Sequence, residues 1–252
     1  MEEKILHYVT EIQTEEDIQI LLACETGSRA WGFPSPDSDY DVRFIYKHKK
    51  DWYLSLNEKK DTIERMFENN EFDLSGWDLR KCLLLLLKSN PPLLERIQSP
   101  IVYMADQNFL SEINVLAQSC YSKIATMYHY LSMSKKMYSE IQGKENIKLK
   151  KLFYALRTAI ACKWIEEKDE IPPIVFQKML NELTIETHLK QRILELIELK
   201  ATKNENYLHN QEPEIGKFIE NCIVQAENIS KSLPASKGNI EELNSFFTRS
   251  LQ

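Results

Sequence analysis

The first third of the chain consists of short apolar runs separated by turns. Residues 17–26 (DIQILLACET) form an apolar run that stops at a glycine, which predicts a buried strand. Residues 39–46 (DYDVRFIY) alternate strictly, with aromatic and aliphatic side chains on one face and Asp39, Asp41 and Arg43 on the other. Because successive side chains of a strand point to opposite faces, this alternation predicts a half-buried strand.

Two further strands and a helix follow before residue 91. The segments 62–67 (TIERMF) and 71–76 (EFDLSG) have strand composition and flank Asn69–Asn70, a dipeptide that suits a hairpin turn. The segment 78–90 starts with an aspartate of the kind that caps helices, and it stops before Pro91–Pro92. These signals predict a hairpin followed by a helix.

Beyond about residue 106 the periodicity becomes helical. Residues 148–167 place large apolar side chains on one stripe, and 184–202 and 214–233 show a similar pattern. We therefore predict a mixed α+β fold, in which an α/β module with a short mixed sheet precedes an all-helical domain. The predicted domains are residues 1–108 and 109–252.

Composition supports a folded chain and argues against a membrane protein. The 252 residues are 43% hydrophobic and 28% charged, with only six glycines. The longest apolar run, Leu83 to Leu87, is far shorter than the ~20 residues of a membrane-spanning helix. The acidic N-terminal segment lacks secretory features, and the five cysteines never form a C-x-x-C pair. We expect buried thiols, a cytoplasmic location and no membrane association.

Net charge argues against a general nucleic-acid coat protein. The chain carries a formal charge of −6, with 20 acidic against 13 basic side chains in residues 1–110 and 18 against 19 in residues 111–252. An acidic first part suits a site rich in carboxylates. A solvated acidic surface explains the same imbalance.

The segment 27–41 (GSRAWGFPSPDSDYD) carries the candidate chemistry. Gly27 permits a tight turn, after which backbone N–H groups and the Ser28 hydroxyl can hold phosphate oxygens. Asp39 and Asp41 lie two residues apart on a predicted strand, so both carboxylates leave the same face. Mg²⁺ favours a few carboxylates combined with substrate phosphates.

A third carboxylate would complete a two-metal site for phosphoryl transfer. Asp73, in the middle of the 71–76 strand, is the best-placed candidate, and Asp78 is the alternative, although a helix cap explains Asp78 equally well. Taken singly, a Gly-Ser turn or an Asp-x-Asp pair is weak evidence. A calcium loop is excluded because Val42 and His48 occupy positions that require glycine and glutamate.

The ordered set of strand, Gly-Ser, Asp-x-Asp and later aspartate resembles the signature of the DNA polymerase β-like nucleotidyltransferases. The stretches GSRAWGFPSPDSDYDVRFIY, DLSGWDLRKCLLLLLKSNPPLLERIQSPIVY and KKLFYALRTAIACKWIEEKDEIPPIVF resemble the YcgL/RlaP family of predicted nucleotidyltransferases. The motifs cover roughly residues 15–180. One departure is Glu95-Arg96, where the family pattern leads us to expect Glu-Trp.

This resemblance implies roles for individual residues. Gly27 and Ser28 would bind the phosphates of an NTP, Asp39 and Asp41 would ligate Mg²⁺ or Mn²⁺, and Asp73 would lie nearest the attacking hydroxyl. The implied reaction moves a nucleoside monophosphate from the NTP to an acceptor hydroxyl and releases pyrophosphate. The family name implies a link to RNA repair, in which an RNA 3′ end would be the acceptor, whereas the residues themselves leave RNA, a protein and a small hydroxyl compound open as acceptors. No stable protein partner is indicated.

Several basic side chains are weaker candidates for nucleotide binding. Arg29 follows the phosphate turn, and Lys81 lies in the helix after Asp78. Lys150, Tyr154 and Arg157 recur at helical spacing on the face opposite the apolar stripe of 148–167, where they could clamp phosphates. A solvated surface explains these basic positions as well. A catalytically silent nucleotide-binding protein or an interaction protein of the same fold is the rival to the enzyme.

Overall fold

The computed structural model describes residues 1–168, 170–234, 236 and 238–252. The chain divides into two compact units that are interleaved in sequence. Unit 1 comprises Met1–Ala30, Asp39–Tyr121 and Lys237–Gln252, and unit 2 comprises Trp31–Ser38 and Ser122–Ser236. This division differs from our sequential one at residue 108, because a short internal segment joins unit 2 and the C-terminal segment joins unit 1.

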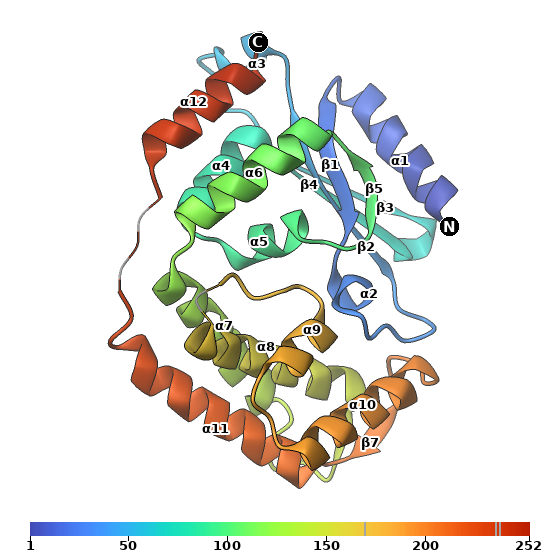
Figure 1. Ribbon diagram of the computed structural model, residues 1–252. Coiled ribbons are helices and arrows are strands. Elements are labelled where there is room, and N and C mark those ends of the chain that lie inside the picture. The colour runs from blue at the N-terminus through green and yellow to red at the C-terminus, as the bar shows by residue number, and fades with distance from the viewer. Residues whose placement is uncertain (169, 235, 237) are drawn as a thin grey trace. The chain divides into compact units, whose positions relative to one another are not determined.

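Unit 1 is built on a five-stranded mixed sheet (Figure 1). Its strands, in the spatial order β3-β4-β2-β1-β5, are β3 (Thr62–Phe67), β4 (Phe72–Asp78), β2 (Tyr40–Lys47), β1 (Gln19–Glu25) and β5 (Val102–Ala105). The β2–β4 pair is parallel, and the other three pairs are antiparallel. The sequence prediction of a mixed sheet in an α+β fold is confirmed.

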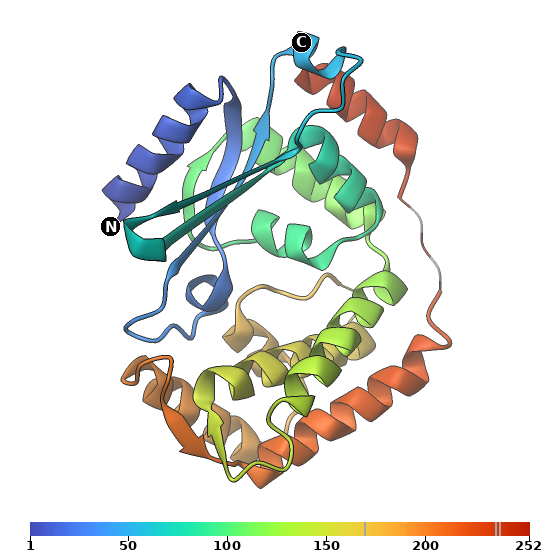
Figure 2. The same cartoon turned by 180° about the vertical axis from the view of Figure 1, so that it is seen from behind.

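Helices cover both faces of this sheet (Figures 1 and 2). On one face lies α1 (Glu2–Glu15). On the other lie α4 (Leu79–Leu87), α5 (Pro91–Ile97) and α6 (Gln107–Cys120), with α12 (Ile240–Ser250) packed on α4. The unit also contains the short elements α3 (Lys50–Tyr53) and η1 (Glu68–Asn70), and all of α2 (Gly27–Trp31) except its last residue, which belongs to unit 2.

The alternation of β2 explains which face is apolar. Val42, Phe44 and Tyr46 are fully buried in a cluster with side chains of α1, whereas Asp41 and Arg43 lie on the opposite face and are half-buried. The opposite face is not wholly polar, because Ile45 on it is also fully buried, but Asp41 and Arg43 near the start of the strand remain partly accessible and available for polar chemistry.

The turn signals also act as predicted, with one exception. The β3–β4 hairpin turns through η1, where Asn69 and Asn70 adopt positive φ, a conformation that asparagine tolerates. Asp78 caps α4 by accepting a hydrogen bond from the Arg80 N–H at 2.8 Å. The exception concerns Pro91 and Pro92. Helix α4 ends before them, as predicted, but they also occupy the first positions of a second helix, α5, where proline costs no hydrogen bond.

Unit 2 is helical apart from a two-stranded ribbon of β6 (Asn146–Lys148) and β7 (Leu208–Asn210), within the residues that the structure describes. Its helices are α7 (Lys123–Ser139), α8 (Leu149–Glu167), α9 (Phe176–Glu182), α10 (Thr187–Ala201) and α11 (Pro213–Ser230).

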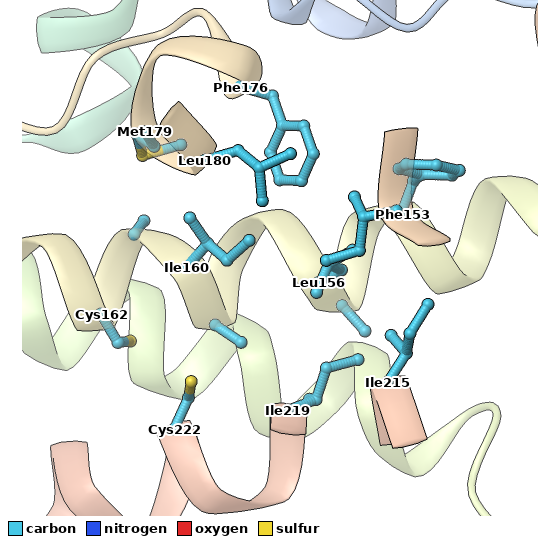
Figure 3. Close-up of a cluster of buried hydrophobic side chains, with 14 of the residues drawn as sticks. Phe153, Leu156, Ile160, Cys162, Phe176, Met179, Leu180, Ile215, Ile219 and Cys222 are labelled. Atoms are coloured by element: carbon cyan, nitrogen blue, oxygen red, sulfur yellow. The ribbon is translucent and has the colours of Figure 1, made fainter. Parts of the chain in front are cut away.

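Helix α8 forms the centre of unit 2. Most of its residues are buried, and its apolar side chains meet those of α9 and α11 in one cluster (Figure 3). Phe33, from the short segment 31–38, is 1% exposed and packs against Phe153 and Phe176 in this cluster. The segment that connects α2 to β2 is therefore part of the unit 2 core. Among the described residues, no helix has the length and apolarity needed to cross a membrane.

Candidate active site

Asp41 and Asp73 lie side by side on the two parallel strands of the sheet. They are direct partners in the β2–β4 register, and neighbouring strands are about 4.8 Å apart. Both carboxylates are partly accessible, with side chains 36% and 27% exposed. The structure therefore brings together two of the three carboxylates that we proposed from the sequence as metal ligands.

Arg43 joins these two carboxylates. Its Nη2 donates to Asp41 Oδ1 at 3.1 Å and to Asp73 Oδ2 at 2.7 Å, and its Nη1 donates to the Asp73 carbonyl at 2.8 Å. Sequence reasoning placed Arg43 on the same strand face but gave it no role. Alternation along one strand cannot show which residue of another strand lies opposite.

Hydrogen bonds fix both the backbone N–H and the backbone carbonyl of Asp41. Its N–H donates to Glu25 Oε1 at 2.7 Å, while the N–H and hydroxyl of Thr26 both donate to its carbonyl at 2.9 Å. Glu25 is fully buried, and Tyr103 donates a hydrogen bond of 2.5 Å to its other oxygen. Burial raises the pKa of Glu25, and the hydrogen bond from Tyr103 counteracts this. Glu25 was missed by our sequence reasoning, although a charged residue ending an apolar strand was a usable signal.

Gly27 is required where the turn passes Asp41. Its φ is +62°, and a Cβ built on it would lie only 2.2 Å from Asp41 Oδ2. No other residue type fits without moving that carboxylate. Ser28 follows in α2 and is 6% exposed. The Gly-Ser turn and Asp41 are therefore in direct contact, as the order of the sequence motifs suggested.

Asp39 and Arg29 lie at the entry to β2. Asp39 precedes the first residue of the strand and is exposed. Arg29 donates from Nε to the Asp39 carbonyl at 3.1 Å, and its guanidinium lies 3.9 Å from the centre of the Tyr40 ring. Arg29 is thus fixed next to the Asp-x-Asp motif, where a cation is useful if anionic phosphates bind.

Asp78 and Lys81 lie at the far end of β4. Asp78 pairs in register with Tyr46, five residues beyond the Asp41–Asp73 pair, which is roughly 16 Å along a strand. Its carboxylate is buried, caps α4 and accepts a hydrogen bond from Tyr53, and burial raises its pKa. Lys81 Nζ is bound to Asp61 at 2.8 Å. The structure does not bring either residue together with Asp41.

The basic row of α8 lies inside unit 2. Lys150 pairs with Glu205 at 2.6 Å, and Tyr154 contacts the Trp31 ring edge-to-face at 5.2 Å between centroids. Arg157 lies 4.3 Å from the centre of the Trp31 ring and is only 4% exposed. Arg157 is therefore buried, whereas the sequence had suggested a polar face opposite the apolar stripe. Trp31 covers that face.

A hollow of about 380 Å³ opens beside Asp73 on the β3 side. Its lining consists of residues from β2, β3 and β4, namely Arg43, Glu64, Arg65, Met66, Asp73 and Ser75. The Gly-Ser turn contacts Asp41 from the β1 side. The two carboxylates consequently separate the Gly-Ser turn from an open polar hollow.

Asp41 and Asp73 fit a magnesium ion that takes two protein carboxylates. Among the described residues, no group of three or more histidine, cysteine, aspartate or glutamate side chains is arranged to hold a metal. Mg²⁺ does not need such a cage, because one or two carboxylates plus substrate phosphates and water commonly complete its shell. The lack of a Cβ at Gly27 allows Asp41 Oδ2 to lie directly against the Gly-Ser turn, and both aspartates supply hard oxygen donors.

Comparison with known proteins decides the family. Residues 1–249 match the RlaP family, described as an RNA repair pathway DNA polymerase beta family. The chain belongs to the RlaP family. The uncharacterized protein YcgL of Bacillus subtilis (strain 168) is 42% identical over 246 residues, which are 97% of this chain and 94% of that protein.

The RlaP match confirms the resemblance that we identified from the motifs, and it covers nearly the whole chain. Among solved structures, a nucleotidyltransferase-like protein from Exiguobacterium sibiricum 255-15 is 13% identical. The match covers 90% of this chain and 75% of that one, with a TM-score of 0.29.

Proposed function

We propose that this RlaP-family protein is a metal-dependent nucleotidyltransferase that moves a nucleoside monophosphate from an NTP to the hydroxyl of an RNA 3′ end. The observation that carries the proposal is the in-register pair of Asp41 and Asp73 next to the Gly-Ser turn. A pair of half-exposed carboxylates behind a phosphate-binding turn is the minimum that this chemistry requires.

The proposed reaction is an in-line displacement at the α-phosphorus. The acceptor oxygen forms a new bond to this phosphorus, the bond to the β-phosphate bridging oxygen breaks, and pyrophosphate leaves with that electron pair. The proton of the acceptor hydroxyl goes to a carboxylate oxygen of Asp73, which borders the open hollow. Positioning and charge neutralisation supply most of the rate enhancement in reactions of this kind.

The residues of the chain have separate tasks in this proposal. Gly27 and Ser28 hold phosphate oxygens, and Arg29 adds positive charge beside Asp39. Asp41 and Asp73 hold Mg²⁺ or Mn²⁺, which when bound supplies charge neutralisation on the phosphates and lowers the pKa of a coordinated hydroxyl, and Asp39, exposed at the entry to β2, is the third candidate ligand. Glu25 and Thr26 keep Asp41 in place through its backbone.

Two considerations support an RNA end as the acceptor. The family description refers to an RNA repair pathway. The net charge of −6 disfavours a long RNA footprint, whereas a single 3′ end entering a hollow needs few cations.

The test is transfer of label from each of four α-³²P NTPs to total cellular RNA in the presence of Mg²⁺ or Mn²⁺. We expect labelled RNA with the wild-type protein and a loss of more than about 100-fold in Asp41→Asn and in Asp73→Asn. Asp61→Asn is the matched control, because Asp61 is a partly exposed aspartate at the far end of β4, where it pairs with Lys81.

The outcomes separate the rival functions. Wild-type turnover in both Asn variants would refute the proposed site. Stabilisation of the protein by NTP and metal without any transfer would favour a silent nucleotide-binding protein instead. Label on proteins but not on RNA would keep the reaction and replace the acceptor.

A further inference from the structure

Arg43 lies in a row of three side chains that crosses the sheet. In the strand register Arg43 is the partner of Ser75, and Ser75 is the partner of Glu64. The neighbouring row contains Asp41, Asp73 and Met66 in the same order. Arg43, Ser75 and Glu64 all line the hollow beside Asp73. Arg43 thus has Asp41 and Asp73 in the neighbouring row and Glu64 in its own row.

The present position of Arg43 conflicts with cation binding. Its guanidinium contacts both carboxylates, and its side chain is only 18% exposed. Arginine keeps its charge at all ordinary pH values, so it cannot yield by losing a proton. A divalent cation held by the same oxygens would be strongly repelled by a guanidinium at this distance, since screening by water is weak there. Arg43 must therefore move when the cation binds.

Glu64 provides the place to which Arg43 can move. Glu64 is exposed, and among the described residues its carboxylate has no hydrogen-bond or ion-pair partner, although its backbone carbonyl accepts from Arg65 Nη1. Two strand spacings, about 9.6 Å between Cα atoms, separate Arg43 from Glu64. Because Arg43 and Glu64 lie on the same face of the sheet, their two long side chains can span that distance across Ser75. The hollow between them gives the guanidinium room to turn.

We infer that Arg43 is a displaceable counter-ion of the metal site. It pairs with Asp41 and Asp73 when the divalent cation is absent, and it pairs with Glu64 across the hollow when the cation is bound. Arg43 thereby holds the two carboxylates side by side when no metal is bound, and its competition with the cation sets the affinity of the site for the metal. This inference rests on the proposed function, because it assumes that these carboxylates hold the cation.

The experiment measures Mn²⁺ affinity from the electron paramagnetic resonance signal of free Mn²⁺, with no nucleotide present. Arg43→Gln should bind Mn²⁺ about tenfold more tightly than the wild type, because the competing charge is gone. Arg43→Lys, which keeps the charge without the two-pronged contact, should give an intermediate value. Arg65→Gln is the matched control: Arg65 lines the same hollow but pairs with Glu16, so less than a twofold change is expected.

A double-mutant cycle tests the part played by Glu64. Glu64→Gln should weaken Mn²⁺ binding about threefold in the wild-type background and leave it unchanged in Arg43→Gln, because Glu64 acts only through Arg43. If Glu64→Gln weakened binding equally in both backgrounds, Glu64 would act directly on the cation and the exchange would be wrong.

Failure of this inference is distinguishable from failure of the proposed function. If Asp41→Asn and Asp73→Asn lose Mn²⁺ binding while Arg43→Gln and Arg43→Lys both match the wild type, the metal site stands and the counter-ion role is refuted. If the Asn variants bind Mn²⁺ as tightly as the wild type, the metal site itself is refuted. Far-ultraviolet circular dichroism of each variant identifies any that fail to fold, and the remaining arginine variant then decides the outcome.

Discussion

The two units each hold a basic side chain among polar partners, but in different ways. In unit 1, Arg43 is partly exposed and contacts two carboxylates that border an open hollow. In unit 2, Lys200 is 1% exposed, donates to the Ser35 hydroxyl at 2.9 Å and lies 5.8 Å from the centre of the Phe33 ring. Burial lowers the pKa of Lys200 to about 8.

These two cationic side chains differ in whether their partners can be replaced. The two carboxylates that Arg43 contacts are partly accessible and one of them borders the hollow, so a cation can reach them and replace the guanidinium. Lys200 is enclosed, and removing its hydroxyl partner would leave a buried polar group unsatisfied. Arg43 therefore suits a site whose occupants change, whereas Lys200 anchors the segment 31–38 in the unit 2 core. That segment is also the covalent link between the Gly-Ser turn and Asp41.

The largest effect is expected from breaking the anchor at Phe33. Phe33→Ala removes a fully packed ring and should lower the unfolding free energy of unit 2 by about 3–5 kcal/mol. Hydrogen exchange measured by mass spectrometry resolves the two units. Phe72→Ala is the matched control, because Phe72 is equally buried in unit 1. Loss of protection confined to unit 1 in Phe33→Ala would contradict the assignment of this segment.

A smaller effect is expected from the titration of Lys200. Between pH 8 and its ordinary pKa of 10.5, the unfolded chain binds more protons at this residue than the folded protein does. The unfolding free energy should therefore rise with pH through this window, by up to about 3 kcal/mol relative to Lys200→Met, and should show no such relative change below pH 8. Urea unfolding of both proteins from pH 7 to 10.5 measures it. If the unfolding free energies of the two proteins changed in parallel with pH across this window, burial would not lower the pKa of Lys200.

The smallest effect on stability is expected at Gly27, with a large effect on the site. Gly27→Ala should cost about 1–2 kcal/mol for its positive φ and weaken Mn²⁺ binding at least about tenfold, because the new Cβ displaces Asp41 Oδ2. Gly143→Ala is a matched control with a similar φ of +73° and no atom within 4 Å of the new Cβ. It should show the stability cost alone. Equal Mn²⁺ affinities in the two variants would show that the close approach has no bearing on the metal site.

Local patterns in the sequence determined much of unit 1. The alternation in 39–46 predicted β2 and its polar face, and Asn69–Asn70 predicted the hairpin turn. The Gly-Ser and Asp-x-Asp motifs also carried the resemblance that the RlaP match confirms. These features succeed because strand alternation, turn conformation and motif spacing are all set by residues close together in the chain.

Only the tertiary structure decided how distant residues meet. The parallel pairing of β2 with β4 puts Asp73 beside Asp41 and moves Asp78 away, and it makes Arg43 a partner of both aspartates. Likewise, Trp31 covers the α8 face that periodicity had suggested was polar. Strand register and helix packing depend on burial summed over the whole unit, so no local window of the sequence contains them.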